Sequence, residues 1–128
     1  MATQTIAKIA RYVLVFEFIV GGQCRVTKRL TPKISEIAYK HADGYKRFLP
    51  FIPGETAAEH TRNIGVLLLT AGLLMVAPSK GGVRAAGVGL GGVLSLMFLH
   101  VQRSIGVPYW LPVLNSALAG LVLYSEYF

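Results

Sequence analysis

Four long apolar segments dominate this sequence and leave few folds open to it. They cover residues of about 6–24, 57–77, 83–101 and 109–124. Crossing ~30 Å of hydrocarbon takes ~20 apolar residues in a helix, so each segment approaches the length of a membrane span. Only 15% of the residues are charged, against about 25% in soluble domains. The segments predict an all-α integral membrane protein with four spans. The alternative, a small soluble core, would carry charge along every element.

Short links between the last three segments predict how the helices are arranged. Residues 78–82 combine Pro78, Lys80 and two glycines, which is typical of a tight connection, and residues 102–108 form a second short link. Such links place consecutive helices antiparallel, so a chain of 128 residues is expected to form one up-down four-helix bundle. Gly87 with Gly91, and Ser116 with Gly120, have the spacing of small residues at which membrane helices pack closely.

An amphipathic helix is predicted over residues 32–49, between the first and second spans. Thr31 suits the helix cap and Pro32 suits the first helical position. One stripe collects the apolar side chains Ile34, Ile37, Ala38, Tyr45, Phe48 and Leu49. This helix is expected to lie on the lipid headgroups or to cap the bundle; docking to a partner protein is the alternative.

The basic residues are concentrated at one side of the predicted bundle. The net charge of +7 alone would suit nucleic acid, but the placement of the charge does not, so no nucleic-acid partner is expected. Eight of the thirteen lie between the first two spans: Arg25, Lys28, Arg29, Lys33, Lys40, Lys46, Arg47 and Arg62. With Arg103 they make nine, against four on the other side, where Lys8 and Arg11 are expected to reach water from the end of the first span. Because cytoplasmic loops are rich in Lys and Arg, both termini are predicted to face away from the cytoplasm.

Polar residues within the spans are the candidate functional residues, since ionisable groups in lipid are costly unless they have partners. Glu17 lies at the centre of the first span, and Asn115 lies at a similar depth in the fourth. His100 lies nearer the same surface, and Arg62 opens the second span. They predict either an intramembrane polar pocket that binds a lipophilic ligand or relays protons, or a structural clamp between helices in which Glu17 is protonated or paired with Arg62.

No motif in the sequence points to a metal or another cofactor. Cys24 is the only cysteine, and neither His60 nor His100 has a second ligand at metal-binding spacing. The glycines of residues 87–92 lack the lysine and the strand of a phosphate-binding loop. Candidate nucleophiles such as Ser95 have no adjacent base in the sequence. We therefore expect no metal and no cofactor, and the sequence leaves open whether the protein is an enzyme.

Several short stretches resemble DoxX-like membrane proteins, in particular the branch that contains the nicotinic-receptor assembly chaperone. The distinctive element is Leu30-Thr31-Pro32, and the similarity covers residues of about 10 to 120. It continues through residues 33–39 and 45–50, Arg62 to Gly65, Ala71-Gly72 and Phe98 to Gln102. Relatives often carry an acid a few residues after the glycine that corresponds to Gly65, whereas this chain has Val66 to Leu69.

The resemblance implies a four-helix membrane bundle but not a single function. Some relatives are assembly chaperones of the endoplasmic reticulum, and others are associated with quinone-linked redox complexes. It therefore implies a multi-pass accessory protein with a membrane-protein partner, in the endoplasmic reticulum or another endomembrane if the source is eukaryotic. The alternative is a membrane-embedded enzyme or redox subunit that acts on a lipophilic or quinone-like substrate.

Overall fold

The computed structural model of this chain describes residues 2–77 and 82–127, which form six helices and contain no strand. Four helices are long: α1 (Ala2–Val26), α4 (Ala57–Met75), α5 (Gly82–Ile105) and α6 (Trp110–Tyr127). Two short helices, α2 (Pro32–Lys40) and α3 (Ala42–Phe48), connect α1 to α4. The all-α prediction is confirmed, and each long helix covers one of the four predicted segments.

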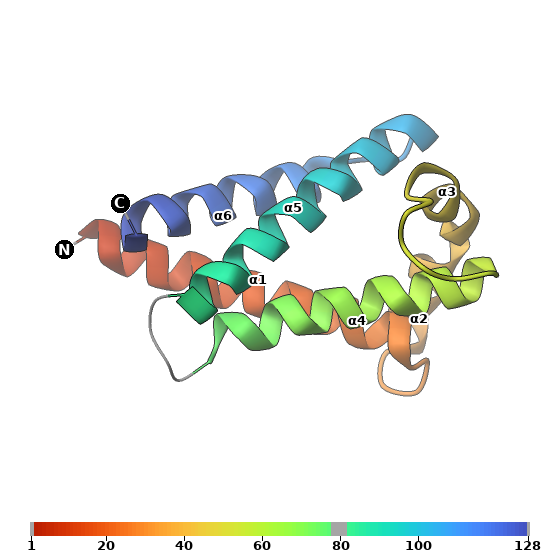
Figure 1. Cartoon of the computed structure of the whole chain (residues 1–128), viewed down its shortest axis with the longest axis horizontal. Coiled ribbons are helices and arrows are strands. Elements are labelled where there is room, and N and C mark those ends of the chain that lie inside the picture. The colour runs from red at the N-terminus through yellow and green to blue at the C-terminus, as the bar shows by residue number, and fades with distance from the viewer. Residues whose placement is uncertain (1, 78–81, 128) are drawn as a thin grey trace.

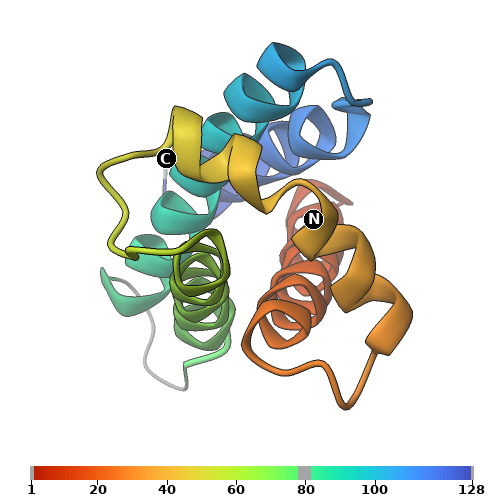
Figure 2. The ribbon, with the colours of Figure 1, turned by 90° about the vertical axis from the view of Figure 1, so that its right-hand side faces the viewer.

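The long helices run up and down in chain order (Figure 1). The start of α1 and the ends of α4 and α6 lie at one end of the bundle, and α2, α3 and the link between α5 and α6 lie at the other. Figure 2 looks along the bundle and shows α2 and α3 lying across that second end. Contacts join α1 to α4, α4 to α5, α5 to α6 and α6 to α1, so the four helices close into a ring. Residues 78–81 of the predicted link 78–82, with Lys80, lie outside the described residues, and Gly82 begins α5.

Glycines set the closest approaches between the long helices. A Cβ atom on Gly22 of α1 would lie 2.9 Å from the Gly65 carbonyl oxygen of α4, and one on Gly65 would lie 2.8 Å from the Gly22 carbonyl oxygen. On α5, a Cβ atom on Gly87 would lie 2.8 Å from the Met75 backbone nitrogen. Gly87 therefore packs inside the bundle, as its spacing predicted. Gly120 does not, because open space surrounds its Cβ position.

The predicted amphipathic helix is divided in two at His41, which ends α2 and precedes α3. The apolar stripe continues into the core only in the second half, where Tyr45 and Leu49 are buried. In α2 the two isoleucines of the stripe stay exposed, Ile34 by 42% and Ile37 by 65% of their surface.

Hydrogen bonds to the end of α1 explain why α2 turns its polar side inward. The buried Ser35 hydroxyl donates to the Cys24 carbonyl oxygen at 2.7 Å, and the Tyr39 hydroxyl donates to the Arg25 carbonyl oxygen. The last carbonyl groups of a helix have no partner within the helix. Thr31 stands at the expected cap position, but its hydroxyl makes no cap bond and instead accepts from the Gln23 side chain at 2.6 Å. Helix α2 therefore caps α1 with polar side chains.

Large apolar side chains point outward from all four long helices. Among the most exposed are Phe16, Leu73, Leu96 and Tyr124, with 57–71% of their surface accessible. Polar residues lie inside the same bundle, including Arg11, Ser95 and Asn115. A soluble domain has the opposite preference, since buried polar groups require partners and apolar groups are driven from water.

Arg11 does not reach water, contrary to the expectation from its position near the start of the first span. The residue is buried, and its Nη1 donates to the Met75 carbonyl oxygen at 2.9 Å. On α5, Arg84 Nε donates to the Ala77 carbonyl oxygen at 2.8 Å. Positive groups beside the carboxyl end of a helix are favourable because they meet unpaired carbonyl oxygens. Two arginines thus join α1 and α5 to the end of α4.

Within the described residues, α5 is the helix that is both long and apolar enough to cross a membrane by length and composition. Helix α6 is also apolar, but its apolar stretch, Trp110–Ser125, is shorter than that of α5. Helix α1 carries charged residues along its length, and α4 opens with the polar run 59–63, which lowers the apolar character of both. Only 28% of the apolar window of α5 is buried, whereas the core helix of a soluble protein is mostly buried.

Replacing Gly87 by alanine is expected to lower the stability of the bundle by about 1–3 kcal/mol, because the new methyl group would meet the backbone of α4. The matched control is Gly89→Ala, two residues further along α5 at a position with open space. There alanine is expected to be neutral or slightly stabilising through its better helix propensity. Unfolding of the detergent-solubilised protein measures both effects. Equal stability of the two variants would contradict the close approach of α5 and α4.

Candidate functional site

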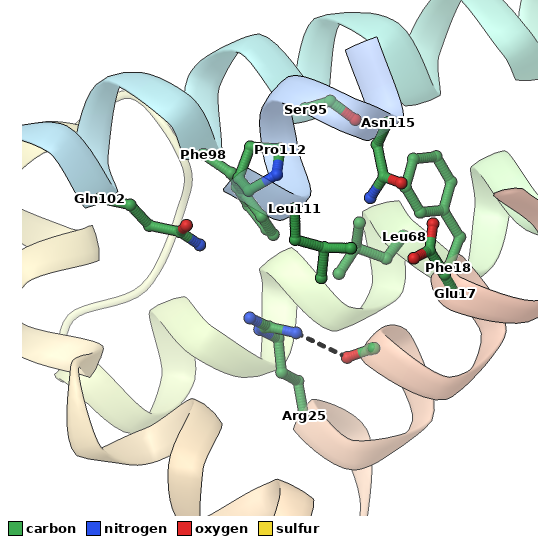
Figure 3. A pocket seen from close by; sticks show the side chains of 11 residues that line it. Glu17, Phe18, Arg25, Leu68, Ser95, Phe98, Gln102, Leu111, Pro112 and Asn115 are labelled. Atoms are coloured by element: carbon green, nitrogen blue, oxygen red, sulfur yellow. Dashed lines mark hydrogen bonds between the residues drawn. The ribbon is translucent and has the colours of Figure 1, made fainter. Parts of the chain in front are cut away.

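A cavity of about 120 Å³ lies between α1, α4, α5 and α6 (Figure 3). Helix α1 contributes Glu17, Phe18, Gly21 and Arg25, and α4 contributes Leu68. The remaining lining residues come from α5 and α6: Ser95, Phe98, Gln102, Leu111, Pro112 and Asn115. The cavity therefore has apolar walls and several polar groups, which is the usual character of a small-molecule site.

Helical periodicity brings the α1 residues to one face. Glu17, Gly21 and Arg25 follow one another at intervals of four, so these three positions lie on the same side of the helix. Arg25 folds back along this face, and its Nη1 donates to the Gly21 carbonyl oxygen at 2.8 Å. Its guanidinium group also lies 5.3 Å from the centre of the Phe98 ring. Arg25 thus reaches over the cavity from the end of α1, as Figure 3 shows.

Polar groups from α5 also line the cavity, and each has a partner. The Ser95 hydroxyl donates to the Gly91 carbonyl oxygen at 2.8 Å. The Gln102 side-chain nitrogen donates to the Tyr45 hydroxyl of α3 at 2.7 Å. The ring of Tyr45 meets that of Phe98 edge-on, with 5.2 Å between centroids. These contacts connect the cavity wall to the short helices at the end of the bundle.

Two acceptor oxygens of the cavity differ from these groups because they have no hydrogen-bond partner among the described residues. Glu17 Oε2 and Asn115 Oδ1 are buried, and neither has a hydrogen-bond partner among the described residues. Asn115 as a whole is 7% exposed. A buried polar atom without a partner costs about 1–3 kcal/mol, so two in one cavity call for a functional account.

Glu17 and Asn115 are the two predicted site residues that the structure brings together. His100 is exposed and does not line this cavity; its ring meets that of Phe48 with 6.0 Å between centroids. It follows Phe98 by two residues, which at 3.6 residues per turn places it about 200° around α5. Arg62 is exposed on α4 and also lies outside the lining. Helix rotation decides these placements.

Arg25 and Gln102 are two polar lining residues that the sequence did not single out as site residues. Arg25 was counted only among the basic residues of the loop. Its interval of eight from Glu17, equal to two steps of four, was the available signal for a shared helical face. No comparable signal exists for Gln102, whose role depends on the position of Tyr45 in α3.

The buried histidine His60 has a structural contact. His60 lies in the first turn of α4 rather than in a loop, is fully buried, and its Nε2 is 2.8 Å from the Leu49 carbonyl oxygen. In the part of the chain that the structure describes, no group of three or more His, Cys, Asp or Glu side chains is placed to hold a metal ion.

Comparison with known proteins adds no relative to this description. No family model, no curated protein and no solved structure matches the chain.

Replacing Tyr45 by phenylalanine is expected to lower the free energy of unfolding by about 1 kcal/mol, because it removes the hydroxyl that accepts from Gln102. The matched control is Tyr109→Phe, in the link between α5 and α6, where the side chain is 43% exposed. Its effect should stay within about 0.5 kcal/mol. Unfolding curves in detergent measure both variants. If the two lost the same amount, the cavity wall would not depend on α3.

Proposed function

We propose that this chain is a multi-pass membrane protein with four spans that acts as an accessory or assembly protein of the DoxX-like kind. The observation that carries this proposal is the distribution of side chains over the bundle. Large apolar groups such as Phe16, Leu73 and Leu96 face outward, while Arg11 and Asn115 lie inside. Lipid is the solvent that suits such an exterior, because it does not penalise exposed apolar surface.

Charge supports an orientation for the bundle. The end that carries α2 and α3 collects the basic loop residues, and Arg103 lies in the last turn of α5 at the same end. We propose that this end faces the cytoplasm and that both termini face the opposite side. The exposed Trp110 and Tyr124, near the two ends of α6, suit the two headgroup layers.

Helix α2 supports the accessory role. Ser35 and Tyr39 hold its backbone against the end of α1, and Ile34 and Ile37 on the same helix stay exposed. An apolar helical side at the cytoplasmic end of a membrane bundle can meet headgroups or a membrane partner. Together with the resemblance to assembly chaperones, it favours a partner protein beside α2 in an endomembrane.

The second candidate function is an enzyme or redox subunit that acts on a lipophilic substrate. The cavity of Figure 3 favours it, since Glu17 and Asn115 offer polar atoms beside apolar walls. Glu17→Gln separates the two candidates. An accessory protein should retain assembly of its partner, with catalysis in purified membranes unchanged, whereas an enzyme should lose turnover while assembly continues.

The topology is tested by placing one epitope tag at each terminus and a third in the link after α3. After selective permeabilisation of the plasma membrane, the link tag should be accessible to antibody and both terminal tags protected. This outcome follows from the excess of Lys and Arg at that end. Cytoplasmic terminal tags would reverse the orientation, and accessibility of all three tags would contradict the four-span proposal.

The partner surface is tested by the double variant Ile34→Ser and Ile37→Ser. Because both side chains are exposed, the bundle should keep its stability while recovery of the specific membrane partner in mild detergent falls by at least about tenfold. The control is Phe51→Ser, an apolar residue outside α2 that is 69% exposed. Unchanged recovery with the double variant would remove α2 from the proposed interface.

A further inference from the structure

Two hydrogen-bond acceptors in the cavity have no donor in the described part of the chain. Glu17 Oε2 comes from α1 and Asn115 Oδ1 comes from α6, and each lacks a partner among the described residues. Both residues line the cavity of Figure 3, from the neighbouring helices α1 and α6. A hydrogen-bond donor from a bound molecule would satisfy atoms that the bundle itself leaves unpaired.

The charges of the lining restrict which donor fits. The cavity lining holds both Glu17 and the Arg25 guanidinium, so a charged group of either sign meets one like charge, and for a cationic amine that charge is Arg25. Glu17 and the Asn115 carbonyl disfavour a carboxylate, which only accepts when ionised. A ketone or a hydrocarbon would leave both acceptor oxygens unsatisfied. Among the common uncharged oxygen groups, the hydroxyl is the one that donates a hydrogen bond.

The size and the walls of the cavity describe the rest of the molecule. An apolar protein cavity of 150 Å³ is known to hold benzene, so about 120 Å³ accepts a group of about that size. Phe18, Leu68 and Leu111 supply apolar wall. A longer apolar chain therefore has to extend beyond this cavity.

A second cavity gives such a chain a place to continue. It lies beneath α2 and α3, with His41, Tyr45 and Trp110 in its lining. Both cavities are lined by Arg25, Gln102 and Leu111, which therefore stand between them. Since Gln102 is bonded to Tyr45, movement of α3 would alter this passage.

We propose that the bundle binds a neutral, hydroxyl-bearing amphiphile, whose hydroxyl donates its single hydrogen to the Asn115 carbonyl oxygen beside Glu17 and whose apolar part lies against Phe18, Leu68 and Leu111. The passage at Arg25 and Gln102 connects this site to the end of the bundle that carries α2 and α3. The inference rests on the proposed function in one respect, that the cavity lies at membrane depth. It assigns the ligand class of the site without requiring a reaction.

Matched ten-carbon probes test the proposal on the full chain in detergent. Equilibrium dialysis, corrected with empty micelles, compares 2-decanol with 2-decanone, which differ in the donor hydrogen and little in shape. The protein should bind 2-decanol about tenfold more tightly, the effect of about one net hydrogen bond. Protonated 2-aminodecane and decanoate should bind more weakly than 2-decanol, because of Arg25 and Glu17 respectively.

Asn115→Leu should abolish most of the preference for 2-decanol over 2-decanone, because it removes one acceptor and retains a side chain of similar size. The control is Thr61→Val, which alters another buried hydroxyl that has no partner among the described residues but lies outside the cavity lining. It should keep the wild-type preference. If Asn115→Leu does not fold, the comparison of the two probes on the unaltered protein still decides the matter.

Equal binding of 2-decanol and 2-decanone by the unaltered protein would overturn the proposal and indicate that water satisfies both oxygens. Tighter binding of the ketone, the amine or the carboxylate would overturn it, because the site would then prefer a different functional group. Correct topology with no preference for the alcohol would refute this site alone. A failed topology experiment would instead refute the proposed function, whatever the probes show.

Discussion

The close approach of α1 and α4 at Gly22 and Gly65 is the contact on which the rest of the bundle depends. Each glycine meets the carbonyl oxygen of the other, a separation that no larger residue permits. With α4 held there, the opposite side of α1 remains free to face α6, with which it also packs. Glu17 of α1 and Asn115 of α6 both line the cavity between these helices. Small residues have this effect in membranes because packing, rather than exclusion of water, brings helices together.

Unsatisfied backbone groups explain the two ends of the bundle. At one end, the Met75 carbonyl oxygen of α4 receives a hydrogen bond from Arg11 of α1. At the other, the Cys24 carbonyl oxygen of α1 receives one from Ser35 of α2. Free carbonyl oxygens are costly away from water, so buried helix ends need such partners. The same requirement turns the apolar side of α2 outward and creates the surface proposed for a partner.

The proposed ligand site and the proposed partner surface lie in different parts of the bundle. Glu17 and Asn115 offer acceptor atoms between the long helices, whereas Ile34 and Ile37 lie at the basic end. Gln102 connects these regions, since it lines the cavity and bonds to Tyr45 of α3. An accessory protein that binds both a lipid-like molecule and a partner could couple the two through this contact, without needing a catalytic group.

Hydropathy and link length were enough to determine the number, order and approximate ends of the long helices, because apolar length and breakers act locally along the chain. Charge and residue type also identified Glu17 and Asn115 as unusual. Helix rotation was not readable, and only the tertiary structure decided it. It turned His100 and Arg62 away from the cavity, brought Arg25 and Gln102 into it, and divided the predicted amphipathic helix at His41. The reason is that rotation depends on contacts between helices, such as Gly22 with Gly65, and on carbonyl groups that seek donors from distant parts of the chain.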